Sequence, residues 1–574
     1  MDWISRNEDL FWSFLPLALG GVGLLGRLQA LSGAVRLLPL VAIAGGAAVL
    51  AASVSGGELA VARAWGLAPV AALLALGGIA SLGASRDGDD EAGDLLVTCA
   101  LALLSVTADS VVGMLVPVAA LLAWAGSSGL RMGSRSVGLA RVVALGSAAV
   151  SLGLGVHGAR LRSAGGATGA IEWLGLPLRG DAGTTAVFLA LVIPLLLPGR
   201  VGGPTAGLCA RNPVARSSAA VVVVHVTLIW ALQVLFGGVE ALRTVGLVGL
   251  GLALAASAGP RRSARVRHAG LFQGAASLVV FGAGTGDEGA ACGVALALAA
   301  HAVAAAVISL AVSRARALAG SGGLRAMPQT TIFAWIAGLS LVGFPLTLGG
   351  LGASIGLGSA VRDGAETWSS VALIGSALLT GLVLVPLLLE PSGGSEVADP
   401  PAGQRAGGVA VPAAAGLGAA FLIATGLVPG ALQFLLPHPG ASLAAYPDPM
   451  ILTGAIAAGV LLGAPLKERL GLLPVARCRQ RDGHPAHEVA ILWASPRCGP
   501  PANLHRQGGA TAPERCGDRG SAGPLVGAPI RERRDKQLQR SVPIAVIGIE
   551  GMGKPGLSIW IRDIPSRSRP QHRL

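Results

Sequence analysis

Two histidines and an aspartate interrupt long apolar stretches of the chain and are the first candidates for chemistry. His225 and His301 are each flanked on both sides by Val or Ala, and Asp109 stands between two apolar stretches. An ionisable side chain in hydrocarbon is costly unless it is paired or lines a wet cavity. Because imidazole changes charge near neutral pH, the two histidines could relay protons. The alternative is a structural histidine, bonded to a backbone carbonyl or hydroxyl of a neighbouring helix.

A proline and two glycines interrupt another apolar run, residues 330–349. Gly343, Pro345 and Gly349 occur where a continuous helix would need an unbroken ladder of backbone hydrogen bonds. Proline removes one donor and clashes with the preceding turn, so the helix is expected to break here. Broken helices at membrane depth are tolerated beside protein or water, and transporters use them at ion sites. The break is a second candidate site, although a kinked structural helix is an equally open interpretation.

The elements that must position these residues follow from the composition. Of the 574 residues, 52% are hydrophobic and 13% are charged, and the mean hydropathy is +0.67. A soluble protein of this length would carry about a quarter of its residues as charged ones, so much of the surface must face lipid. Crossing a bilayer takes roughly 17 to 25 apolar residues in a helix. The chain is therefore predicted to be an all-α, polytopic transmembrane helix bundle.

Apolar runs of suitable length recur along the chain, and the Gly and Ala within them allow helices to approach closely. Some runs are short, so they predict about 14 spans, with broken helices among them. The runs lie near residues 11–27, 37–54, 65–83, 94–108, 110–127, 138–156, 184–198, 218–236, 241–258, 269–285, 290–312, 330–349, 368–390, 409–429 and 449–465.

Three regions follow from this pattern: N-terminal transmembrane helices over 1–93, a transmembrane core over 94–465, and a basic tail over 466–574. The net charge is +13, but the tail alone holds 19 basic and 9 acidic residues. Most of the excess therefore lies in the tail, and no nucleic-acid partner is expected. The Arg-, Pro- and Gly-rich tail is predicted to be disordered, or to be the product of a shifted reading frame at the end of the gene.

Two patterns in the tail fall short of a binding site. Gly548–Lys554 fits a phosphate-binding loop, but Pro555 stands where a Ser or Thr hydroxyl is needed for magnesium. Cys478, Cys498 and the two histidines between them could bind zinc, but their spacing matches no paired arrangement. No cofactor, metal or catalytic residue is expected in this chain.

The order of the motifs resembles one known family, the antiporter-like membrane subunits of respiratory complex I (NADH:quinone oxidoreductase) and of Mrp-type sodium/proton antiporters. The most specific stretch is Gly322–Pro328 followed by Gly343-Phe344-Pro345 and Gly349, which looks like the family's G-G-L-x-x-x-M-P and G-L-P-P-x-x-G-F patterns. The family places this pattern on a broken helix. Other segments follow the family order over about residues 100–470: Pro198–Ala215, Arg261–Ala275, His301-Ala302 and Gly426–Gly430.

The departures from the family pattern concern its protonatable residues. The resemblance implies a proton path built from a membrane Glu, a Lys on a first broken helix, and further Lys or His residues. The Glu would fall near Val118, where no acidic residue occurs, and the first Lys falls within a residue of His225. His301 is kept, but Ala305 or its neighbour replaces the following Lys, and no Lys or Glu follows Gly349. Since coupled pumping in the family depends on alternating Glu and Lys pairing, reduced or lost proton translocation is favoured.

The resemblance implies an integral subunit, in the inner or plasma membrane of a prokaryote, that works with other membrane and hydrophilic subunits of a redox or antiporter complex. It would bind no NADH, flavin or iron–sulfur cluster itself, because the sequence contains no motif for them. At most it would be a non-redox part of a translocase. Two alternatives stay open: a stand-alone secondary transporter or channel for a small ion or solute, and a decayed gene product without activity.

Overall fold

The structure is a computed structural model of the chain, and every regular element that it describes is a helix. It describes residues 8–27, 37–55, 58–82, 89–108, 110–128, 182–196, 215–258, 264–317, 328–389, 410–428, 430 and 449–470. Asp109, the apolar run near 138–156 and the predicted tail from residue 471 onward lie outside the described residues.

The helices follow the apolar runs of the sequence, so the predicted all-α class is confirmed. In the first half of the chain they are α2 (Glu8–Arg27), α3 (Leu38–Ser55), α4 (Glu58–Ser81), α5 (Asp89–Thr107), α6 (Val111–Ser128), α8 (Ala182–Leu196), α10 (Ala215–Phe236) and α11 (Ala241–Ser257). In the second half they are α12 (Ala264–Ala283), α13 (Glu288–Ala317), α14 (Pro328–Leu341), α15 (Leu348–Arg362), α16 (Glu366–Leu379), the π-helical segment η6 (Thr380–Leu384), α17 (Val385–Leu389), α18 (Ala410–Leu427) and α19 (Pro449–Leu470).

The largest difference from the predicted spans concerns the run 330–349. The run covers α14 and the break after it, and only its last residues belong to α15, which continues to Arg362 beyond the predicted end. The sequence of α15 is rich in glycine, which lowers helix propensity. The composition therefore does not predict this helix. Most of its residues are buried among neighbouring helices. Packing therefore outweighs the weak local preference.

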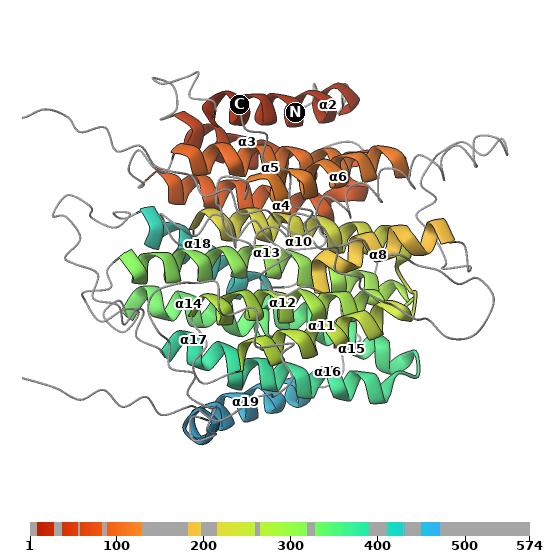
Figure 1. The fold of residues 1–574 in the computed structure, drawn as a ribbon, viewed down its shortest axis with the longest axis vertical. Coiled ribbons are helices and arrows are strands. Elements are labelled where there is room, and N and C mark those ends of the chain that lie inside the picture. Colours follow the sequence, from red (N-terminus) through yellow and green to blue (C-terminus); the bar gives the residue numbers. More distant parts are fainter. Residues whose placement is uncertain are drawn as a thin grey trace, which may run out of the picture. The chain divides into compact units, whose positions relative to one another are not determined.

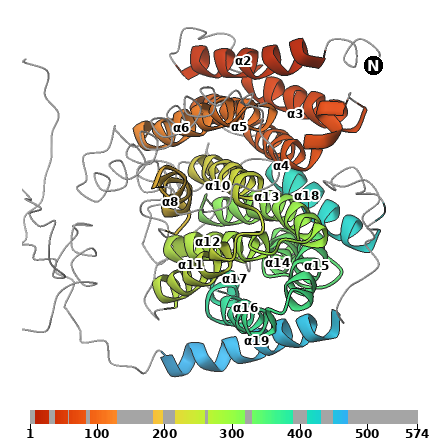
Figure 2. The ribbon, with the colours of Figure 1, turned by 90° about the vertical axis from the view of Figure 1, so that its right-hand side faces the viewer.

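α13 is the central helix of the described bundle. It packs against α4, α10, α12, α14, α15 and α18. Its apolar window is 94% buried, as expected for a helix that is apolar on every side. Figure 1 shows α10, α12 and α13 running side by side, and Figure 2 shows the same group from one end. Residues at the midpoints of these three helices are therefore held deep inside the bundle.

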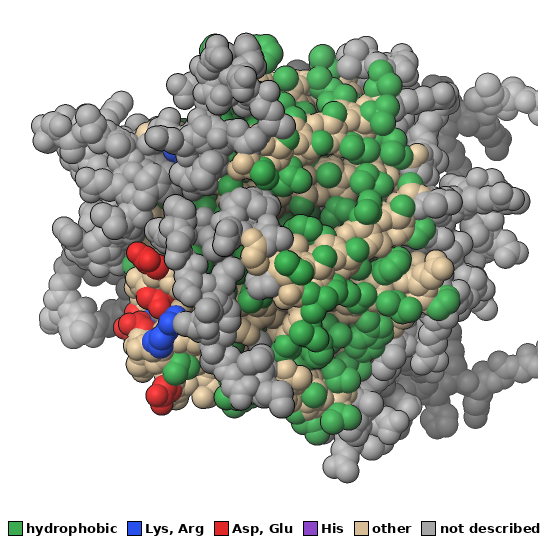
Figure 3. Space-filling view, turned by 180° about the vertical axis from the view of Figure 1, so that it is seen from behind, with side chains coloured by type: hydrophobic (Ala, Val, Ile, Leu, Met, Phe, Trp, Pro, Cys, Tyr) green, Lys and Arg blue, Asp and Glu red, His purple; other side chains and the backbone are tan. Residues whose placement is uncertain are grey.

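The outer surface of the described bundle is largely apolar, as Figure 3 shows for one face. Four helical stretches are long and apolar enough to cross a membrane, and shorter apolar helices of 10–17 residues accompany them. The four are Arg63–Ser81, Glu288–Val312, Glu366–Leu388 and Ala410–Leu427. Large exposed side chains on the helices include Phe14, Val248, Ile374 and Leu461. Charged side chains gather instead at one edge of Figure 3, which is the distribution of an integral membrane protein.

Candidate functional site

His225 of α10 and His301 of α13 lie against each other near the midpoints of their helices. Their imidazole rings are stacked, with centroids 6.1 Å apart and planes inclined by 30°. Both are almost completely buried, with exposed fractions of 4% and 1%. The sequence offers neither histidine a partner close by in the chain. The packing of α10 against α13 supplies one, because it brings the two candidates together.

The two imidazoles lack hydrogen bonds that a structural histidine would be expected to make. Neither ring nitrogen of His301 has a hydrogen-bond partner among the described residues, and the same is true of Nδ1 of His225. A buried polar atom without a protein partner is costly, and it usually marks a place where water or an ion binds. This observation favours the relay interpretation of the pair over the structural one.

The helices are interrupted between Leu341 at the end of α14 and Leu348 at the start of α15, and Gly343 and Pro345 lie in this break. Gly343 has a φ of 91°, in the left-handed region that glycine adopts without steric cost. Thr347 caps α15, since its Oγ1 accepts a hydrogen bond from the N–H of Gly350 at 3.2 Å. The first turn of α15 is thereby stabilised without any continuation from α14.

Serine hydroxyls satisfy backbone groups that the break frees. Ser376 of α16 donates through Oγ to the carbonyl oxygen of Val342 at 2.5 Å, and Ser340 Oγ accepts from the N–H of Gly349 at 3.1 Å. Gly349 approaches α14 so closely that a Cβ at this position would overlap the carbonyl oxygen of Ser340. Two of the predicted glycines therefore have distinct tasks, a backbone turn at Gly343 and a close contact at Gly349.

A cavity of about 60 Å³ lies between the broken helix and His301, and His225 is not among its lining residues. Its lining includes His301, Ser340, Ser376, Gly343 and Gly349, whereas Pro345 is not among the lining residues. The lining is mostly apolar, and its polar side chains are those of His301, Ser340 and Ser376. A buried water needs two to four polar partners, so water would be held only beside these three side chains. The imidazole of His301 offers two nitrogens without a partner among the described residues, whereas the two hydroxyls already bond to backbone groups at the break. The polar side chains that share the cavity with His301 therefore lie beside the break.

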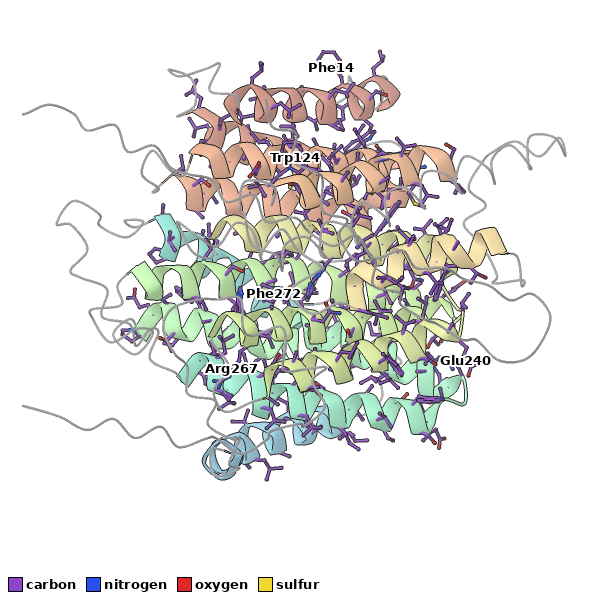
Figure 4. All side chains as sticks on the ribbon, viewed as in Figure 1. Phe14, Trp124, Glu240, Arg267 and Phe272 are labelled. Carbon is purple, nitrogen blue, oxygen red and sulfur yellow. The ribbon has the colours of Figure 1, made fainter. Side chains whose placement is uncertain are left out.

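Three residues that sequence reasoning did not single out extend the cluster on α12 and α13. The ring of Phe272 lies edge-on to His301 with centroids 6.3 Å apart, and the ring of His268 lies 4.2 Å from Phe272. The Oγ atom of Ser309 is 3.5 Å from Nε2 of His268. Spacing in the sequence could have identified these residues. His268 and Phe272 are four apart and share a helix face, and His301 and Ser309 are eight apart and nearly do. Figure 4 labels Phe272 on α12, inside the bundle.

The charged partners of a strong proton pump do not occur at this centre within the described ranges. There, the buried charged side chains are Arg63, Arg243 and Arg267, and no Asp, Glu or Lys is buried. Val118 and Ala305, which stand near the family's Glu and Lys positions, are fully buried apolar residues. The described residues also contain no group of three His, Cys, Asp or Glu side chains that could hold a metal ion.

These features define a class of protein, an all-helical membrane bundle with a broken helix beside a histidine pair. No protein-family model and no curated protein sequence matches the chain. Solved structures do match it. A chain of the Mrp complex from Dietzia sp. DQ12-45-1b is similar at 16% identity and a TM-score of 0.61, over 81% of this chain and 57% of that chain. This chain thus spans little more than half of the Mrp chain's length.

Two respiratory complexes contain similar chains. One is the membrane-bound sulfane sulfur reductase, an archaeal respiratory membrane complex, at 15% identity and a TM-score of 0.56, over 80% of this chain and 99% of that chain. The other is respiratory complex I from Thermus thermophilus with bound NADH, at 20% identity and a TM-score of 0.55, over 79% and 99%. The chain therefore has the antiporter-like fold, and the resemblance of its sequence motifs is confirmed at the level of the fold.

Proposed function

We propose that this chain is an integral membrane subunit of a multi-subunit complex of the respiratory or cation/proton antiporter kind, in the inner or plasma membrane of a prokaryote. The antiporter-like fold and the apolar surface of the described bundle support this assignment. Other membrane and hydrophilic subunits would carry any redox chemistry. This subunit contributes a weak proton path along the histidine pair.

The contact between His225 and His301, at a centre where the structure describes no buried carboxylate or lysine, carries the proposal. Two positive charges at the 6.1 Å separation of the rings would repel each other by roughly 3 kcal/mol at an effective dielectric constant of 20. The pair therefore holds one proton at a time. No neighbouring group among the described residues changes its charge and so shifts the proton affinity of the pair strongly. Proton conduction is therefore slow, and its coupling to events in other subunits is weak.

Purification from native membranes tests the partnership. A tagged copy at its own locus, extracted in mild detergent, is expected to co-purify in stable stoichiometry with other membrane subunits and with hydrophilic subunits. A single chain that elutes alone and transports a small solute after reconstitution would contradict the proposal and support the stand-alone transporter instead.

A further inference from the structure

Phe272 separates two imidazoles that belong to different parts of the bundle. Its ring contacts the rings of both histidines: the centroids of Phe272 and His301 are 6.3 Å apart, and those of Phe272 and His268 are 4.2 Å apart. All three side chains are buried, with exposed fractions of 3% for Phe272, 1% for His301 and 8% for His268. His268 also lies beside Ser309, two turns along α13 from His301, so Phe272 lies between the two imidazoles along the helices.

The two imidazoles have different surroundings. His301 lines the cavity at the broken helix, and neither His268 nor Phe272 is among the lining residues. His268 instead lies beside a hydroxyl, because the Oγ of Ser309 is 3.5 Å from its Nε2. Ser309 stands eight residues after His301 on α13, so it marks the same side of that helix two turns further on.

His268 lies close to one end of the bundle. It is in the second turn of α12, which begins at Ala264, and its neighbour is the buried Arg267. Figure 4 places Arg267 and Glu240 on opposite sides of Phe272 along the bundle. A proton that reached His268 would therefore have left the centre of the bundle and moved toward one aqueous side.

A phenyl ring can neither donate nor accept a proton, and it displaces the water that could carry one. Protons move between titratable groups through hydrogen bonds or water chains, so an apolar ring between two imidazoles interrupts the path. A side chain of this kind closes a route when it lies between the groups and opens it when it turns away. Rotamer changes of buried rings are compatible with slow, gated conduction.

We propose that Phe272 is a gate in the proton path, and that His268 is the proton acceptor on its outer side. The route then runs from the cavity at the broken helix through His301, past Phe272, to His268 and Ser309. This inference rests on the proposed function, since it requires that His301 carries protons. The inference adds two features to the proposed proton path: Phe272 limits the proton flux, and the path leads toward the end of the bundle where His268 lies.

Proton flux into liposomes tests the gate. The purified full chain is reconstituted, a potassium diffusion potential drives protons inward, and a trapped pH-sensitive dye reports them. Phe272→Ala is expected to raise the flux at least about tenfold, which corresponds to a barrier lowered by about 1.4 kcal/mol. Phe272→Leu, which keeps an apolar side chain in the gap, is expected to conduct like the wild type.

Further variants separate a gate from a general loss of packing. Phe236→Ala removes another buried ring, one that packs against Phe188 and takes no part in the imidazole contacts, and it is expected to leave the flux unchanged. Phe272→Gln keeps most of the volume and adds polarity, so it raises the flux even if the Ala variant folds poorly. Adding His268→Ala to either open variant is expected to abolish the gain and to lower the flux to the wild-type level or below it.

The outcomes distinguish the gate from the proposed function. Wild-type flux in both Phe272→Ala and Phe272→Gln overturns the gate, whatever the histidine variants do. A rise that persists without His268 overturns its role as acceptor. If His301→Ala lowers the flux while the Phe272 variants conduct like the wild type, the proposed function stands and the gate alone is wrong.

Discussion

His301 stacks on His225 at 6.1 Å, and neither nitrogen of its own ring has a hydrogen-bond partner among the described residues. Stacked rings present their faces to each other, whereas proton transfer requires a nitrogen of one ring to point toward a nitrogen of the other. A transfer between the two histidines therefore needs a bridging water or a ring rotation. The pair is arranged to pass protons slowly.

Replacing His301 by Phe should leave the stability of the protein nearly unchanged. The substitution keeps an aromatic ring and removes two buried nitrogens that have no described partner, so no hydrogen bond is lost. We expect a change within about 1 kcal/mol, measured by thermal unfolding in detergent. His268→Phe is the control, because this ring lies near the Ser309 hydroxyl and should lose stability. A large loss in the His301 variant would mean that the pair is structural.

The hydroxyl of Ser376 should stabilise the broken helix. Ser376→Ala leaves the carbonyl of Val342 without its donor, and we expect a loss of about 1 kcal/mol. Ser370 on the same helix is exposed and bonds only to the carbonyl of Glu366 one turn earlier. Ser370→Ala should therefore have no measurable effect on the unfolding temperature. Equal effects of the two variants would argue against a special role for Ser376.

Gly349 should tolerate no side chain. A Cβ there would overlap the carbonyl oxygen of Ser340, so Gly349→Ala must push α15 away from α14 at a cost of about 1–3 kcal/mol. Gly251 on α11 provides the control, because a Cβ at that position meets nothing within 4 Å. Gly251→Ala should be neutral or slightly stabilising in the same unfolding assay. A stable Gly349→Ala protein would contradict the geometry of the break.

The ion pair between Arg243 and Asp363 should matter more than the neighbouring pair of Arg362 and Asp287. The Arg243 side chain is only 9% exposed, whereas Arg362 is 53% exposed and lies 3.5 Å from its partner. Asp363→Asn leaves a buried guanidinium without its counter-charge, and we expect a loss of about 1–3 kcal/mol. Asp287→Asn should cost less than about 1 kcal/mol, as exposed pairs do. The ranking is read from urea or thermal unfolding of the two variants.

The helices could be predicted from the sequence because a membrane imposes a length on each apolar run, and α10 and α13 lie close to their predicted spans. The broken-helix residues Gly343, Pro345 and Gly349 could be proposed from the sequence because proline and glycine act locally, and their role stays a prediction. The contact between His225 and His301 could not be predicted, because it depends on how α10 packs against α13. His268 escaped notice because it follows a run of arginines that looks like an aqueous loop. Asp109 stays a prediction.

Proton flux through liposomes that contain the wild-type chain, His225→Ala, His301→Ala or the double variant tests the proton path most directly. Because the two histidines act in series, each single variant should lower the flux to the level of the double variant, close to that of empty liposomes. Equal flux in all four proteins, each present in the membrane at the same amount, would show that protons do not pass through the pair.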